Sequence, residues 1–361
     1  MKKQIWVTQP TLAPLSEVIP YLESIWETGV MTHNGPLMQQ LESNLCSYLN
    51  VSNMVCVANG TCAMQIAIRA LDLTGEIITT PFTFIATANI ITWERCRPVF
   101  VDINPDTWTI DPHKIEEAIT ENTSAILPVH VFSAPCDVEL IEKIAEKHQL
   151  KVVYDAAHAM AVKYKGHSVL SYGDISCVSF HATKLFNTAE GGGCVAKDPD
   201  VSERLRRLRF FGFNDNKDIV DDGMNAKMTE VNAALGLANL RHIDETIRVR
   251  KYKYNLYLQL LSELPFLTFQ KINPESYNYS YMPVLFDSEE ILLEVSKSLI
   301  EYGIMPRRYF YPSLSSVQLF QPLRSLPIAE RVSKCILCLP LYTTLSDEDI
   351  EMICELIKKC V

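Results

Sequence analysis

Residues 125–157 read AILPVHVFSAPCDVELIEKIAEKHQLKVVYDAA and contain two apolar, strand-like runs with a helical run between them. The strand-like runs are AILPVHV (125–131) and KVVYDAA (151–157), and the segment VELIEKIAEKH (138–148) repeats its apolar residues at helical spacing. Near-continuous apolar strands joined by amphipathic helices are typical of parallel strands that are buried on both faces. The stretch therefore predicts one β-α-β unit of an α/β sheet.

The same alternation extends over residues 54–197. Strand-like and helix-like segments follow one another in the order MVCVA (54–58), NGTCAMQIAIRAL (59–71), EIITT (76–80), FIATANIITWE (84–94), PVFVDI (98–103) and HKIEEAI (113–119). This pattern predicts a three-layer αβα domain with a mainly parallel sheet. Because no GxGxxG follows the first strand, a dinucleotide site is disfavoured.

The pattern changes after residue 228. Residues 228–264 predict a long helical stretch of the kind that bridges two domains. Short strands (267–271 and 281–286) and two helices (289–303 and 347–360) then predict a small α+β domain. We therefore expect a large domain over residues 1–245, N-terminal segment included, and a small C-terminal domain over residues 246–361.

Charge and hydropathy disfavour nucleic-acid and membrane partners. The formal net charge is −10, and the densest basic run, RLRRLRF (204–210), has the spacing of one helix face. Such a run offers no phosphate-binding footprint for a nucleic acid. No stretch of roughly 18 apolar residues occurs, and the two N-terminal lysines are not followed by an apolar segment. We expect a cytoplasmic protein.

The eleven cysteines are scattered and many lie in apolar segments. This distribution is typical of reduced, buried thiols. CILC (335–338) is a lone CxxC without a second pair, so a core strand is favoured over zinc or redox use. We expect no metal site.

Chemically useful side chains follow several of the predicted strands. Asn59, Gly60 and Thr61 stand where a strand turns into a helix, a position that suits either phosphate binding or a helix N-cap. Asp155 ends the strand KVVYD, where it could cap the next helix or hold a proton on a ring nitrogen. Ligands of open α/β sheets bind beyond the carboxyl ends of strands, so these residues are candidates for one site.

SFHATKLFNTAEGGGC (179–194) places Lys184 between a strand-like run and three glycines. Taken alone, the lysine is more typical of a solvated surface group. The glycines could leave room for a ligand or form a tight turn. A phosphate cradle that includes Ser179, an acid for a pyridinium nitrogen and a Schiff-base lysine are together what pyridoxal phosphate (PLP) requires. The combination predicts a PLP site.

The chain resembles the DegT/StrS-type sugar aminotransferases, fold-type I PLP enzymes that act on nucleotide-linked keto sugars. The resemblance runs nearly end to end and is carried by these blocks: NGTCAMQIAIRAL, TTPFTFIATANII, PVFVDINPDTWTID, the segment 125–159, SFHATKLFNTAEGGG, GMNAKMTEVNAALGLANL and GIMPRRYFYP.

The resemblance implies a role for each matching position. Lys184 would bind the cofactor covalently and act as the general base, and Asp155 would pair with the pyridinium nitrogen. His158, where many relatives have glutamine, would bond to the phenolic oxygen. Four further residues would contact the cofactor: Phe84 stacking on its ring, Gly60, Thr61 and Ser179 at its phosphate. Asn225 would reach the phosphate in a neighbouring subunit, which implies a homodimer with shared sites.

The resemblance also implies a reaction in two stages. L-glutamate leaves its nitrogen on the cofactor, and a keto sugar then takes that nitrogen up. The N-terminal segment and RRYFYPSL (307–314) are most similar to enzymes that aminate C4 of dTDP-4-keto-6-deoxy-D-glucose, giving dTDP-4-amino-4,6-dideoxy-D-glucose for O-antigen and lipopolysaccharide synthesis. Arg308 and Tyr309 are candidates for substrate contacts, although Ser313 stands in a stretch where many relatives carry histidine.

Three alternatives remain at this point. The first is amination at C3 of a dTDP-3-keto-6-deoxyhexose by the same residues. The second is a sugar dehydratase, which is disfavoured because those relatives carry histidine in place of the lysine. The third is a PLP-binding regulator without catalysis, against which the retention of both Lys184 and Asp155 argues, because binding alone requires no proton shuttle.

Overall fold

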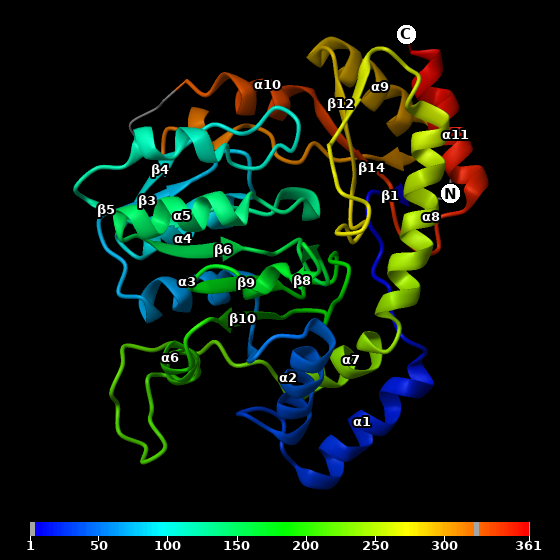
Figure 1. Cartoon of the computed structure of the whole chain (residues 1–361). Coiled ribbons are helices and arrows are strands. Elements are labelled where there is room, and N and C mark those ends of the chain that lie inside the picture. Colours follow the sequence, from blue (N-terminus) through cyan, green and yellow to red (C-terminus); the bar gives the residue numbers. More distant parts are fainter. Residues whose placement is uncertain (1–3, 321–324, 361) are drawn as a thin grey trace.

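A seven-stranded sheet forms the centre of the protein, whose computed structural model describes residues 4–320 and 325–360 (Figure 1). The strand order is β2-β10-β9-β6-β5-β3-β4. Neighbours pair in parallel except β10, which is antiparallel to both β2 and β9. The mainly parallel sheet is thus confirmed. Its strands are β2 (Val55–Val57), β3 (Glu76–Thr79), β4 (Arg97–Phe100), β5 (Thr123–Leu127), β6 (Lys151–Asp155), β9 (Ile175–Ser179) and β10 (Gly192–Ala196).

Both faces of this sheet are covered by helices, because successive side chains of a strand point to opposite faces. In β6, Val153 packs with α3 (Gly60–Ala70), α4 (Ile85–Trp93) and α6 (Pro199–Arg209). Val152 and Tyr154 pack on the other face. That face is covered by α2 (Pro36–Leu49), α5 (Val138–His148) and α7 (Glu230–Leu240), with α1 (Leu15–Thr28) against α7. The three-layer αβα architecture is therefore confirmed.

The C-terminal part has its own antiparallel sheet and its own apolar cluster. The sheet has the order β11-β12-β14, and α8, α9 and α11 contribute buried side chains beside it. The short strand β1 pairs in parallel with β13, so the N-terminal end of the chain lies against this C-terminal part. The elements are β1 (Ile5–Trp6), α8 (Ile243–Leu261), β11 (Leu267–Phe269), β12 (Met282–Phe286), α9 (Glu289–Glu301), β13 (Ile304–Met305), α10 (Pro327–Cys335), β14 (Ile336–Leu339) and α11 (Asp347–Lys359).

Two expected helices differ from the structure. The long helical stretch is divided into α7 and α8 at Arg241 and His242, where the His242 ring hydrogen-bonds the Glu17 carboxylate at 3.1 Å and anchors the break to α1. The segment 113–119 forms two 3₁₀ turns, η1 (Pro112–Lys114) and η2 (Glu116–Ala118), in place of an α-helix. Ile119 is already extended and β5 begins at Thr123, so the connection is too short for further turns.

The remaining elements are short. The last three residues of CILC lie in β14, as expected for a core strand, while Cys335 ends α10; both cysteines are buried. All eleven cysteines are free thiols. A hairpin and three further 3₁₀ turns complete the described chain: β7 (Lys163–Tyr164), β8 (His167–Ser168), η3 (Val131–Ser133), η4 (Val169–Ser171) and η5 (Leu314–Ser316).

Candidate active site

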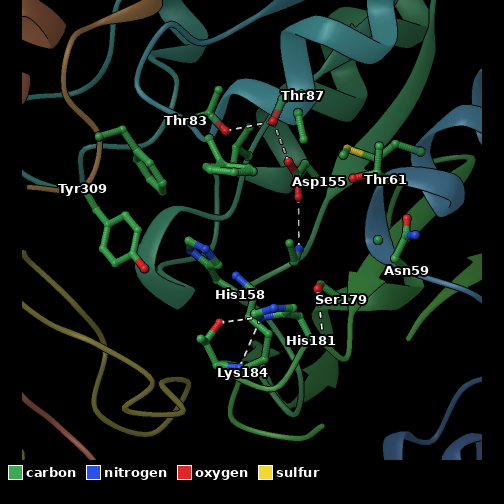
Figure 2. Close-up of a pocket in the computed structure, with 18 of the residues that line it drawn as sticks. Asn59, Thr61, Thr83, Thr87, Asp155, His158, Ser179, His181, Lys184 and Tyr309 are labelled. Atoms are coloured by element: carbon green, nitrogen blue, oxygen red, sulfur yellow. Dashed lines mark hydrogen bonds between the residues drawn. The ribbon is translucent and has the colours of Figure 1, made fainter. Parts of the chain in front are cut away.

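A cavity of about 480 Å³ opens beyond the carboxyl ends of β6 and β9 (Figure 2). It is closed on one side by Tyr281, Arg307, Tyr309 and Phe310 of the C-terminal part. The cavity gathers most of the expected site residues: Gly60, Thr61, Phe84, Asp155, His158, Ser179, Lys184 and Tyr309. Asn225 and Arg308, the other two expected residues, do not line it.

The N-terminus of α3 supplies one end of the cavity. The Asn59 side chain caps the helix by accepting the Cys62 N–H at 2.8 Å, while the first-turn N–H groups of Gly60 and Thr61 lack acceptors within α3. The Ser179 hydroxyl lies against Gly60, because a Cβ atom on that glycine would come within 3.0 Å of Ser179 Cβ. Free N–H groups, a helix N-terminus and two hydroxyls suit a phosphate.

The glycine run after Lys184 allows strand β10 to pack closely against the turn at Asn59 and Gly60. A Cβ atom on Gly192 would approach the backbone of Asn59 and Gly60 to 2.6 Å, and one on Gly193 would approach Met54 Sδ to 2.6 Å. These glycines let β10 lie directly against the turn at Asn59 and Gly60. Of the two alternatives for these glycines, room for a ligand beside the lysine is wrong, because their open sides are filled by protein atoms.

Asp155 is 5% exposed and is held by two hydrogen bonds. Thr87 Oγ1 donates to Oδ2 at 2.7 Å and the Ala157 N–H donates to Oδ1 at 3.1 Å. Since Thr87 gives its proton to the carboxylate, Thr83, whose hydroxyl lies 2.9 Å away, must donate to Thr87. Burial raises the pKa of Asp155, while these bonds and Lys184 oppose that shift. A carboxylate held this firmly can stabilise a proton on a ligand ring nitrogen.

His158 is held in one tautomer. Its Nδ1 accepts the Phe132 N–H at 3.1 Å, so the neutral ring carries its proton on Nε2. Burial lowers the pKa of His158 well below its usual range, with a smaller contribution from Lys184. His158 is therefore a neutral Nε2–H donor at the cavity wall. It can donate a hydrogen bond to a ligand, as the side-chain amide of a glutamine does.

Lys184 projects into the same cavity from the loop after β9. Its pKa is lowered, chiefly by burial and also by the Arg307 charge, whereas Tyr309 and Asp155 oppose the shift. A lower pKa leaves more of the amine unprotonated and nucleophilic. Its Nζ lies 3.2 Å from the Tyr281 hydroxyl. Phe84, 53% exposed at the start of α4, presents its ring to the cavity.

The two arginines of the segment 307–308 point to different places. The Arg308 guanidinium forms an ion pair with Glu289 at 2.6 Å and donates to the Lys334 carbonyl at 2.6 Å, so it is held away from the cavity. Arg307 lines the cavity beside Tyr309, its guanidinium 4.6 Å from the ring centre. The structure thus corrects the expected cation from Arg308 to Arg307, because neighbouring residues of an extended segment point in opposite directions.

Asn225 lies outside the cavity of its own chain. It forms an isolated antiparallel bridge with Phe210, and its Oδ1 accepts a hydrogen bond from Lys227 Nζ at 2.5 Å. Asn225 therefore does not face the cavity of its own chain, and its expected role depends on a second subunit.

Sequence reasoning missed four residues of the site. Thr83 and Thr87 stand four residues apart around the start of α4, and this helical spacing was the signal that could have found them as a pair. Tyr281 and Arg307 carried no local signal that separates them from the neighbouring tyrosines and arginine. They belong to the site because β12 and the 307–310 segment fold over it.

Residues 4–320 and 325–360 lack the features of two other kinds of site. No helix of this region is long and apolar enough to cross a membrane. The same residues contain no group of three or more histidine, cysteine, aspartate or glutamate side chains arranged to hold a metal ion.

The class of PLP-binding transferases is defined by a mainly parallel sheet with a helix N-terminus suited to a phosphate, a buried carboxylate and a lysine of lowered pKa around one cavity. Residues 15–358 match the DegT/DnrJ/EryC1/StrS aminotransferase family, and the chain belongs to that family. It is an aminotransferase that depends on PLP.

Individual relatives cover nearly the whole chain. A dTDP-4-amino-4,6-dideoxy-D-glucose transaminase of Shigella dysenteriae is 43% identical over 99% of this chain and 100% of its own length. The crystal structure of DesI with its TDP-sugar product superposes with a TM-score of 0.95 at 32% identity, covering 100% of this chain and 93% of DesI. NtdA of Bacillus subtilis, solved with the cofactor pyridoxamine phosphate (PMP), superposes at 0.87 with 28% identity over 95% and 82% of the two chains.

Proposed function

We propose that this enzyme transfers an amino group from L-glutamate to C4 of dTDP-4-keto-6-deoxy-D-glucose, giving dTDP-4-amino-4,6-dideoxy-D-glucose. The observation that carries the proposal is the convergence of Lys184 and Asp155 on one cavity that also holds a phosphate-binding helix end. The full-length similarity to a transaminase of that name supports the choice of sugar. The TDP-sugar found in the closely superposing DesI supports the nucleotide.

The residues present fit the cofactor. The orphan N–H groups of Gly60 and Thr61 and the Ser179 hydroxyl would hold its phosphate, and Asp155 would hold the proton on its ring nitrogen. The Nε2–H of His158 would donate to its phenolic oxygen, and Phe84 would cover a ring face. When bound, PLP supplies an electron-withdrawing ring that acidifies the carbon attached to the transferred nitrogen.

Lys184 would perform the proton transfers. As an unprotonated amine it takes a proton from the reacting carbon of the donor, and as an ammonium it returns a proton to C4 of the acceptor. Burial lowers the pKa of Lys184, so a larger fraction of the amine is unprotonated than in a free lysine. The Thr87 hydroxyl and the Ala157 N–H donate to the Asp155 carboxylate and favour its ionised form, against the burial that raises its pKa.

The assembly and setting are also part of the proposal. The enzyme would be a cytoplasmic homodimer in which Asn225 reaches the partner's phosphate site, as its position outside its own cavity allows. Its product would feed O-antigen and lipopolysaccharide synthesis. Residues 1–245 and 246–361 would form two domains, in keeping with separate apolar clusters around the two sheets.

The position of the new nitrogen tests the proposed reaction. Incubation of the enzyme with PLP, L-glutamate and dTDP-4-keto-6-deoxy-D-glucose should yield one aminated sugar with nitrogen at C4, assigned by NMR. Nitrogen at C3, or no aminated product, would contradict the proposal. A visible absorbance band that bleaches with L-glutamate would separate the enzyme from a PLP-binding regulator, whose band no amino acid would change.

The pair Arg307 and Arg308 provides a matched test of the cavity wall. Arg307→Gln should raise KM for an anionic substrate by roughly 10–100-fold, because a charge-assisted hydrogen bond is lost. Arg308→Gln, which removes the Glu289 ion pair outside the cavity, should leave both KM values near those of the parent enzyme. Steady-state kinetics with each substrate varied would decide, and an effect of Arg308→Gln as large as that of Arg307→Gln would contradict the assignment.

A further inference from the structure

The buried hydroxyl of Tyr281 lies within hydrogen-bond distance of the reactive amine of Lys184. The tyrosine precedes β12 in the C-terminal part and is 5% exposed, and its oxygen lies 3.2 Å from Lys184 Nζ. The two residues are 97 positions apart in sequence, so the contact exists only because the C-terminal part closes over the main sheet. The Tyr281 hydroxyl has no part in the proposed reaction or in the proposed cofactor contacts.

The ring of Tyr281 is fixed by its neighbours. It packs against His158 at 4.6 Å and Phe132 at 5.5 Å between ring centres, and meets Tyr309 nearly edge-on at 5.9 Å. Two of these neighbours line the cavity themselves. The tyrosine therefore has little freedom to turn its hydroxyl away from the lysine.

The backbone that carries Tyr281 is fixed as well. Arg250, which is 1% exposed, donates to the carbonyls of Ser280 and Leu341, both at 3.1 Å. The Asn278 amide donates to the carbonyls of His158 and Met160 at 2.9 and 2.7 Å, while its oxygen accepts the Ser280 N–H. The segment before β12 is thus tied directly to the segment that presents His158.

From this arrangement we infer that Tyr281 is a positioning residue that aims the Lys184 amine into the cavity; the inference rests on the proposed role of Lys184. The hydroxyl donates to the lone pair of the neutral amine and accepts from the ammonium, so it keeps the nitrogen in place through each proton transfer. It does not give up its own proton, because burial raises the pKa of Tyr281.

Covalent capture of PLP by the apoprotein tests this role without turnover. The Lys184 nitrogen adds to the aldehyde carbon, water leaves, and added borohydride reduces the resulting C=N bond, so that mass spectrometry locates and counts the product. With Tyr281→Phe, capture at Lys184 should be slower by roughly tenfold, because a small misplacement of a reacting group is costly. The affinity for PMP, which requires no lysine amine, should not change.

The matched control is Tyr277→Phe. Tyr277 is equally buried and lies four residues earlier, but its hydroxyl has no hydrogen-bond partner within the described chain. This variant should capture PLP at the parent rate. Unchanged capture by Tyr281→Phe, or capture and PMP affinity that fall together, would overturn the inference and leave the proposed function intact. Product on a lysine other than Lys184 in the parent protein would instead overturn the proposed site, and the inference with it.

Discussion

A Lys184→Ala protein is expected to lose transamination by at least about 10⁴-fold, because it lacks both the covalent attachment and the general base. Asp155 cannot replace the amine, since its two oxygens are already held by Thr87 and Ala157. His158 cannot replace it either, because its Nδ1 accepts the Phe132 N–H and burial lowers the pKa of the ring. Initial rates with L-glutamate and the keto sugar measure the loss.

Binding separates the loss of chemistry from a loss of structure. Lys184→Ala should still bind PMP, because the phosphate-binding turn at Gly60 and Thr61 does not involve the lysine. Lys197→Ala is a suitable control, since Lys197 is exposed and pairs with Glu142 on the surface. Parent-like turnover by Lys184→Ala would refute the assignment of the base, and failure to bind PMP would show that the substitution damages the site more widely.

Asp155→Asn is expected to lower turnover by roughly 10²–10³-fold, the cost of removing one electrostatic partner from a reacting centre. The change is nearly isosteric, so the Thr87 hydroxyl retains an oxygen acceptor in the cavity wall. The loss should fall on the rate of each half-reaction, because both require the positively charged ring nitrogen that a carboxylate stabilises and an amide does not. Single-turnover measurements with glutamate and with the keto sugar would show this.

A comparable substitution away from the cavity provides the reference. Asp198→Asn alters an exposed residue that caps α6 and should leave both half-reactions unchanged, since asparagine also caps helices. Equal rates for Asp155→Asn and the parent protein would mean that Asp155 has no electrostatic role in the reaction. A lower melting temperature of Asp155→Asn with unchanged rates would mean that Asp155 contributes only to folding stability.

Much of the site was accessible from sequence because it depends on local order. Lys184, Asp155, Ser179 and the 59–61 turn each follow a predicted strand, and parallel strands bring their carboxyl ends to one edge of a sheet. The cavity at that edge contains all of these residues. The chemical roles of these residues could be predicted for the same reason, because a residue's type and its position at the end of a strand both follow from a short segment of sequence.

Errors arose where a local pattern was incomplete. The helical spacing of residues 228–264 runs through Arg241 and His242, but the chain breaks there because His242 is bound to Glu17, more than 200 residues earlier. For the three glycines the sequence allows either space for a ligand or a tight turn, and the structure excludes the space, because atoms of distant segments occupy the Cβ positions. In each case the deciding partner is distant in the chain.

By itself the sequence determined the α/β class, the strand ends that carry Lys184 and Asp155, and the candidate cofactor chemistry. The tertiary structure alone decided that Arg307 rather than Arg308 faces the cavity, that His158 carries its proton on Nε2, and that Tyr281 meets the lysine. The physical reason is the range of the interactions. Strand and helix periodicity act over a few residues, whereas side-chain direction, tautomer and hydrogen-bond partners depend on which distant segments pack together.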